Sequence, residues 1–175
     1  MSFLKRLFGY SSPNSNEIMR PLYRAIVAQG RAPHWYEQGH VPDSMDGRFD
    51  MISSLLALIL LRMEAMPILA QQAAWLTEIF VQDMDAQMRE AGIGDVVIAK
   101  DMGKVMGLLG GRIGAFRGAL ENADQGALRD VILRNIYGET PVDAKAMTHC
   151  IAALTDFWQN LQQYSAEDLM GGKIV

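Results

Sequence analysis

The histidines of this chain are the side chains best suited to bind a metal. His34 and His40 flank Glu37, and imidazole and carboxylate groups are common ligands of zinc. Gly39 interrupts the helix that would align these three side chains, because glycine disfavours helix interiors. The spacing therefore favours histidines in an exposed turn, and we expect neither a metal site nor a bound cofactor.

Cys150 is the single cysteine, so the chain forms no internal disulfide. A cysteine nucleophile needs a thiolate and a nearby base, but Cys150 adjoins Ile151 in an apolar stretch and His149 points to another side of a helix. We expect a buried, unreactive thiol. Asp83 and Asp85 are two positions apart on a predicted helix, where they do not face each other. Because no nucleophile motif or phosphate-binding loop occurs either, the sequence predicts a protein that is not an enzyme.

The elements that carry these residues have helical spacing throughout, with apolar side chains every three or four residues. We expect an all-α protein, a single globular domain of about six or seven helices. The expected helices lie at about 21–29, 46–65, 67–91, 101–122, 124–137 and from 141 onward, with a short turn from 33 and a further start at 165. Expected details are N-caps at Asp46, Asp124 and Thr140, an extended connector at 96–98 and a frayed tail at 171–173.

Composition limits the kind of partner that the protein can have. Half of the 175 residues are hydrophobic, and the net charge of −4 argues against nucleic acid as a partner. The most apolar run, residues 51–61, ends at Arg62 and is shorter than the roughly 20 residues that a membrane-spanning helix needs. We therefore expect a buried core helix there. The 12 methionines are interpreted mainly as core filling, and otherwise as an adaptable binding surface.

The first residues form a separate N-terminal segment, 1–16, ahead of the helical domain, 17–175. Its beginning could lie in a membrane interface or could be a loose chain end, and both alternatives stay open. The proposed membrane-contacting residues are Phe3, Leu4, Lys5, Arg6, Leu7 and Phe8.

A charged turn runs directly into the apolar run of residues 51–61, and we name residues 46–50 the seam. One interpretation makes Asp46, Arg48, Phe49 and Asp50 a contact region for a partner. The alternative is internal: Arg48 pairs with Asp46 or Asp50, and Phe49 fills the core.

Glycines recur inside the helix expected at 101–122, although each costs about 0.5–1 kcal/mol there relative to alanine. One explanation is tight packing against another helix of the same domain, which we favour. The other is a groove formed by Gly110, Gly114 and Gly118 that accepts an apolar helix of a client protein. The glycines are Gly103, Gly107, Gly110, Gly111, Gly114 and Gly118.

Several segments along residues 17–122 resemble the ubiquinol–cytochrome c chaperone family in its short bacterial form. The most specific are Asp46-Gly47-Arg48-Phe49-Asp50 and the turn Gly92-Ile93-Gly94-Asp95. The family usually carries fewer glycines between Lys100 and Leu120. Other matching segments are Leu22-Tyr23-Arg24-Ala25-Ile26-Val27-Ala28-Gln29, Pro33-His34-Trp35-Tyr36, Phe80-Val81-Gln82-Asp83-Met84-Asp85 and Lys100-Asp101-Met102-Gly103-Lys104.

The resemblance implies an assembly factor without enzymatic activity. Family members in mitochondria bind newly made cytochrome b and help to build the cytochrome bc1 complex, together with a small partner subunit near the ribosomal exit. For this chain the resemblance implies a chaperone of cytochrome b or a similar membrane client, located in the cytoplasm and peripheral on the inner face of the bacterial inner membrane. The alternative function is a small helical carrier of haem or quinone, although no motif marks an axial ligand.

Overall fold

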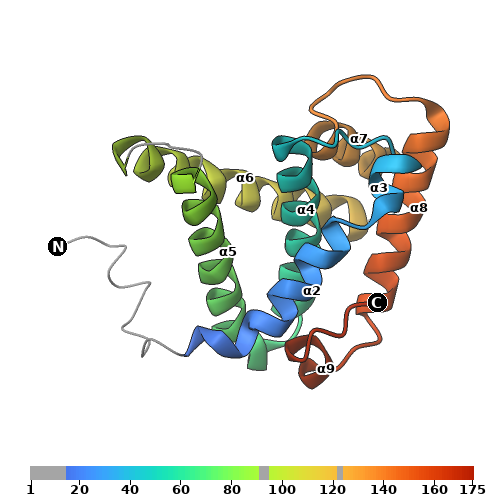
Figure 1. Cartoon of the computed structure of the whole chain (residues 1–175). Coiled ribbons are helices and arrows are strands. Elements are labelled where there is room, and N and C mark those ends of the chain that lie inside the picture. Colours follow the sequence, from blue (N-terminus) through green and yellow to red (C-terminus); the bar gives the residue numbers. More distant parts are fainter. Residues whose placement is uncertain (1–14, 91–94, 122–123) are drawn as a thin grey trace.

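The computed structural model describes residues 15–90, 95–121 and 124–175, and in the second range it describes side chains from residue 102 onward. Within these ranges the chain is all-α, without a strand, which confirms the expected fold class (Figure 1). The elements are the 3-10 turns η1 (Asn16–Met19) and η2 (Pro67–Leu69) and the helices α2 (Arg20–Gly30), α3 (Pro33–Glu37), α4 (Met45–Glu64), α5 (Ala70–Glu90), α6 (Asp95–Glu121), α7 (Gln125–Ile136), α8 (Ala144–Leu161) and α9 (Ala166–Met170).

Helix α4 forms the centre of the domain. It contacts α2, α5, α6, α7 and α8, so it is covered on nearly every side. Residues 51–59 are all buried, which confirms the core helix expected from the apolar run. A helix that is apolar all round fits such a position, because no side of it faces water. No helix in the described part of the chain is long and apolar enough to cross a lipid bilayer.

The start of α4 depends on a close turn. Ser44, and not the predicted Asp46, is the N-cap: its hydroxyl oxygen accepts a hydrogen bond from the amide of Gly47 at 3.1 Å. Ser44 takes this role because it lies three residues before that amide, whereas Asp46 is already inside the helix. A Cβ atom at position 47 would lie 2.0 Å from the carbonyl oxygen of Pro42. Glycine is therefore required for the turn to close.

The other predicted caps have different outcomes. Asp124 caps α7 as expected, and Ser165 and Asp168 form a capping box at the start of α9. The prediction of Thr140 as a cap is wrong, because the Asp143 carboxylate accepts from the amides of Lys145 and Ala146 and α8 begins only at Ala144.

Two predictions at the edges of helices are also wrong. Residues 96–98 are helical and not extended, since α6 begins at Asp95 and the weak preference of valine and isoleucine for strands yields to the longer helix. The C-terminal tail is not frayed, because Ile174 is only 1% exposed and Gly172 lies against the carbonyl group of Pro21. The turn at 92–94 lies outside the described residues.

Candidate partner-binding site

Helix α6 has a bare outer face. Its buried side chains point to one side of the helix, toward α4, α5 and α7, and its glycines lie on the opposite side. All of these glycines are exposed, and a Cβ atom added at any of them would meet nothing within 4 Å in the described structure. The buried residues are Val105, Leu109, Arg112, Phe116 and Ala119, and the glycines are Gly103, Gly107, Gly110, Gly111, Gly114 and Gly118.

This geometry contradicts the explanation of the glycines that we favoured. They do not allow close packing against another helix of the domain, because no described atom approaches their outer side. Alanine would fit at each position and would favour the helix by about 0.5–1 kcal/mol. Within the described part of the chain, the outer side of these glycines therefore packs against no other helix. The apolar side chains of Met106 and Leu108 lie exposed beside them.

The inner side of α6 is held by an ion pair inside the domain. Arg112 is only 4% exposed and donates hydrogen bonds to the Asp50 carboxylate, the Ser53 hydroxyl and the carbonyl oxygen of Asn135. Its guanidinium also lies 5.3 Å from the centre of the Phe49 ring. Burial lowers the pKa of Arg112 while the facing Asp50 carboxylate opposes this shift. The pair ties α6 to α4 and, through Asn135, to α7.

The seam therefore divides into an inner and an outer half. Phe49 is partly buried and stacks on Phe80, with 6.1 Å between ring centres. Asp46 and Arg48 are exposed. The predicted pairing of Arg48 with Asp46 or Asp50 is wrong: Arg48 lies 2.7 Å from Asp43, in the preceding turn.

The candidate metal ligands are not brought together. The His34 Nδ1 atom lies 3.0 Å from the His149 Nε2 atom, and the His40 Nδ1 atom lies 2.7 Å from the Asp143 carboxylate, so the three residues His34, Glu37 and His40 share no site. Sequence reasoning missed the contact between His34 and His149, since the two are 115 positions apart.

The thiol of Cys150 is buried, as expected, and lies 3.0 Å from the hydroxyl oxygen of Tyr137. Burial raises the pKa of the Cys150 thiol, which keeps it protonated and unreactive.

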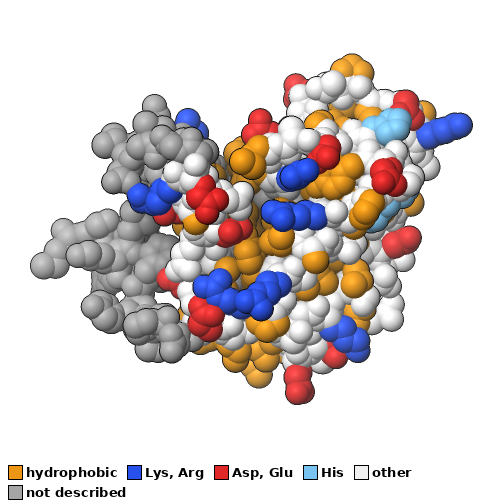
Figure 2. Space-filling model, viewed as in Figure 1, with side chains coloured by type: hydrophobic (Ala, Val, Ile, Leu, Met, Phe, Trp, Pro, Cys, Tyr) orange, Lys and Arg blue, Asp and Glu red, His pale blue; other side chains and the backbone are white. Residues whose placement is uncertain are grey.

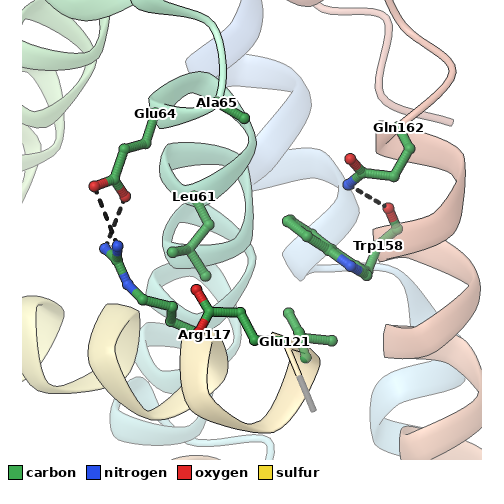
Figure 3. Close-up of a pocket in the computed structure, with 8 residues that line it drawn as sticks. Leu61, Glu64, Ala65, Arg117, Glu121, Trp158 and Gln162 are labelled. Carbon is green, nitrogen blue, oxygen red and sulfur yellow. Dashed lines mark hydrogen bonds and ion pairs between the residues drawn. The ribbon is translucent and has the colours of Figure 1, made fainter. Parts of the chain in front are cut away.

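A pocket of about 390 Å³ lies where α4, α6 and α8 end. Figure 3 shows Leu61 and Glu121 on one side of this space and the Trp158 ring on the other. Glu64 and Arg117 form a two-bond ion pair at its edge, with oxygen–nitrogen distances of 3.2 and 2.7 Å. This pocket could not be predicted from the sequence, because its walls come from three separate helix ends.

A second hollow of about 350 Å³ lies between α4, α5 and α6. Its α5 wall consists of small side chains, and Ile113 of α6 contributes to the opposite side. The small residues on α5 are Ala70, Ala73, Ala74 and Thr77.

Comparisons with known proteins agree on one group. A family profile described as ubiquinol-cytochrome C chaperone matches residues 37–175. A crystal structure of the Cbp3 homolog from Brucella abortus is similar over 98% of this chain and 94% of that chain, with 33% sequence identity and a TM-score of 0.80. A search among curated proteins finds no match.

Proposed function

We propose that this chain, which belongs to the ubiquinol–cytochrome c chaperone family, assists the assembly of the cytochrome bc1 complex by holding cytochrome b or a similar membrane protein. Membership of the family supports the chaperone role, and the client is the part that we add. The outer face of α6 is the observation that supports a client-binding role for this fold. Its glycines occupy exposed helix positions where no described neighbour requires a residue without a side chain.

The face defined by Gly110, Gly114 and Gly118 is the docking surface in this proposal. Small residues four positions apart let the backbone of a second helix approach closely, as they do between membrane helices. The exposed side chains of Met106 and Leu108 flank this face and add apolar contact area. A membrane helix that waits for its partners is a client that fits such a surface.

The two halves of the seam have different roles in the proposal. Phe49 and Asp50 act from inside, because they contact Arg112 and so fix the orientation of α6. Asp46 and Arg48 are exposed at the start of α4, as is Met45 at 67%, and these residues are available for direct contact with a partner.

We also propose that the N-terminal segment, 1–16, touches the membrane through Phe3, Leu4, Lys5, Arg6, Leu7 and Phe8, all of which lie outside the described residues. The domain at 17–175 binds the client in this proposal. Basic and apolar residues together favour an anionic membrane surface. Figure 2 shows Lys and Arg side chains among hydrophobic ones on the face that carries α2, which follows this segment. Arg24 of α2 and Arg31, directly after this helix, are exposed. This arrangement supports a cytoplasmic protein that is peripheral to the inner face of the inner membrane.

Deletion of the gene from its host tests the function. We expect a loss of assembled cytochrome bc1 complex and of haem-loaded cytochrome b, with other respiratory complexes retained, and recovery when the wild-type gene is returned. Normal amounts of the assembled complex in the deletion strain would refute the proposed function.

A further inference from the structure

The pocket at the ends of α4, α6 and α8 receives negative charge from the helix ends as well as from its side chains. Glu64 and Glu121 are the last residues of α4 and α6, and α8 ends at Leu161, beside the pocket residue Gln162. The C-terminal end of a helix carries partial negative charge on its free carbonyl groups. Three such ends therefore point negative charge toward one region of the surface.

Part of this negative charge is already balanced. Arg62 caps the end of α8, since its guanidinium donates to the carbonyl oxygens of Leu161 at 3.0 Å and Tyr164 at 3.3 Å. Arg117 holds Glu64. Glu121 is different: among the described side chains, no cation lies within ion-pair distance of its carboxylate, and it lines the pocket.

The rest of the pocket is apolar. Leu61 and the partly exposed ring of Trp158 form its walls (Figure 3). Leu120 also lines the pocket. Long basic side chains bury their methylene stems on such surfaces and keep the charged head at the polar edge. An indole ring also attracts a cation placed over its face. An apolar wall, an indole ring and a carboxylate without a cationic partner among the described side chains share one hollow, and together they are suited to a lysine or an arginine.

We propose that this pocket binds a lysine or arginine side chain of a protein partner, with the stem against Leu61 and Trp158 and the charged head at Glu121. Membrane helices carry an excess of lysine and arginine at their cytoplasmic ends. A basic residue at the end of the client helix would therefore match the charge of the pocket. This identification of the partner rests on the proposed function, whereas the binding of a basic side chain does not.

The binding of matched peptides to the full chain tests the pocket alone. One peptide is a short leucine–alanine helix that ends in two lysines, and its match ends in two glutamines. The tryptophans are labelled with 5-fluorotryptophan, and the fluorine resonance of Trp158 is assigned with a Trp158→Phe variant. We expect the lysine peptide to shift the Trp158 resonance and to bind about fivefold tighter than the glutamine peptide, the scale of one partly exposed ion pair.

Glu121→Gln is the decisive variant, because the side chain is exposed and the change keeps its shape. We expect the two peptides to bind this variant within about twofold of each other. Asp130→Asn is the matched control, since it removes the same charge from an exposed site on α7, which does not line the pocket, and the preference for lysine should persist.

Equal binding of the two peptides to the wild-type chain would overturn the inference, and so would a preference for lysine that survives Glu121→Gln. Neither result bears on the proposed function, which the deletion strain tests. A strain that assembles the complex normally would refute that function even if the pocket selects lysine.

Discussion

Arg112 of α6 and Asp50 of α4 form an ion pair inside the domain, although the two residues are 62 positions apart in the chain. Asp50 is the last residue of the seam, and Arg112 lies among the glycines of α6. The pair therefore links the two regions that the sequence singled out separately, and it holds the bare face of α6 outward.

Removing one member of this pair should destabilise the domain strongly. In Arg112→Ala, Asp50 loses its cation and Ser53 and Asn135 lose a donor, so we expect a loss of about 3 kcal/mol in the free energy of unfolding. Urea denaturation measures this loss. Arg48→Ala is the matched control, because its partner Asp43 is exposed and such pairs contribute about 1 kcal/mol or less. Equal losses in the two variants would contradict the role of Arg112.

Replacing the outer glycines should separate stability from function. The triple variant Gly110→Ala, Gly114→Ala and Gly118→Ala meets no steric obstacle, and we expect it to be more stable by about 1.5–3 kcal/mol. Client capture should fall, because the added methyl groups keep a second helix at a distance.

Co-purification of the client with the tagged chain measures this capture. Gly171→Ala serves as the control, since that glycine is exposed at the end of α9 with φ −71° and has only ordinary contacts. Unchanged capture by the stabilised triple variant would exclude the glycine face as the docking surface.

Replacing Gly47 by alanine should lower the stability of the domain, in contrast to the same change at the outer glycines of α6. A Cβ atom there collides with the backbone of Pro42 and not with a flexible side chain, so the turn before α4 must shift. We expect Gly47→Ala to destabilise the domain by about 2–3 kcal/mol. Thermal unfolding of Gly47→Ala is compared with that of Gly103→Ala, a change at a helix position where an added Cβ atom meets no described neighbour. A Gly47→Ala variant as stable as the wild type would show that the turn adapts without cost.

The contact between His34 and His149 should make stability depend on pH. Burial lowers the pKa of His34, and the neighbouring His149 adds to this shift. The folded state thus binds a proton less readily than the unfolded state. The contribution is complete above the ordinary histidine pKa of about 6.5 and is lost as the pH falls through that value toward the lowered pKa.

Thermal melting at pH 7.5 and at pH 5.5 measures this effect. We expect the wild type to lose more stability between the two conditions than His34→Gln does. His40→Gln is the control, because His40 is exposed and faces the Asp143 carboxylate. A pH dependence that is the same in wild type and His34→Gln would contradict the prediction.

Local features of the fold were predictable from the sequence. The apolar run of α4, the cap at Asp124 and the helix start at Ser165 depend on residues a few positions apart, and all three predictions are confirmed. The prediction of Thr140 as a cap relied on Pro141 as the first helical residue. The helix begins later, because the Asp143 carboxylate accepts hydrogen bonds from the amides of Lys145 and Ala146.

Distant contacts were not predictable, because helical periodicity says which side chains share a face but not which helix covers that face. The ion pair of Asp50 and Arg112, the contact of His34 with His149 and the pocket beside Glu121 all join segments far apart in the chain. The outward orientation of the glycines on α6 could not be predicted for the same reason. Their spacing was visible in the sequence, whereas their exposure follows from Arg112 on the opposite side of α6.

Photo-crosslinking in native membranes tests the central claim most directly. A photoreactive phenylalanine derivative replaces Gly110, on the outer face of α6, or Asp130, at an exposed site of α7 that the proposal does not use. The account predicts an adduct with cytochrome b from position 110 and none from position 130, in cells that still assemble the cytochrome bc1 complex. Absence of this adduct from position 110 in such cells, or equal adducts from both positions, would contradict the account.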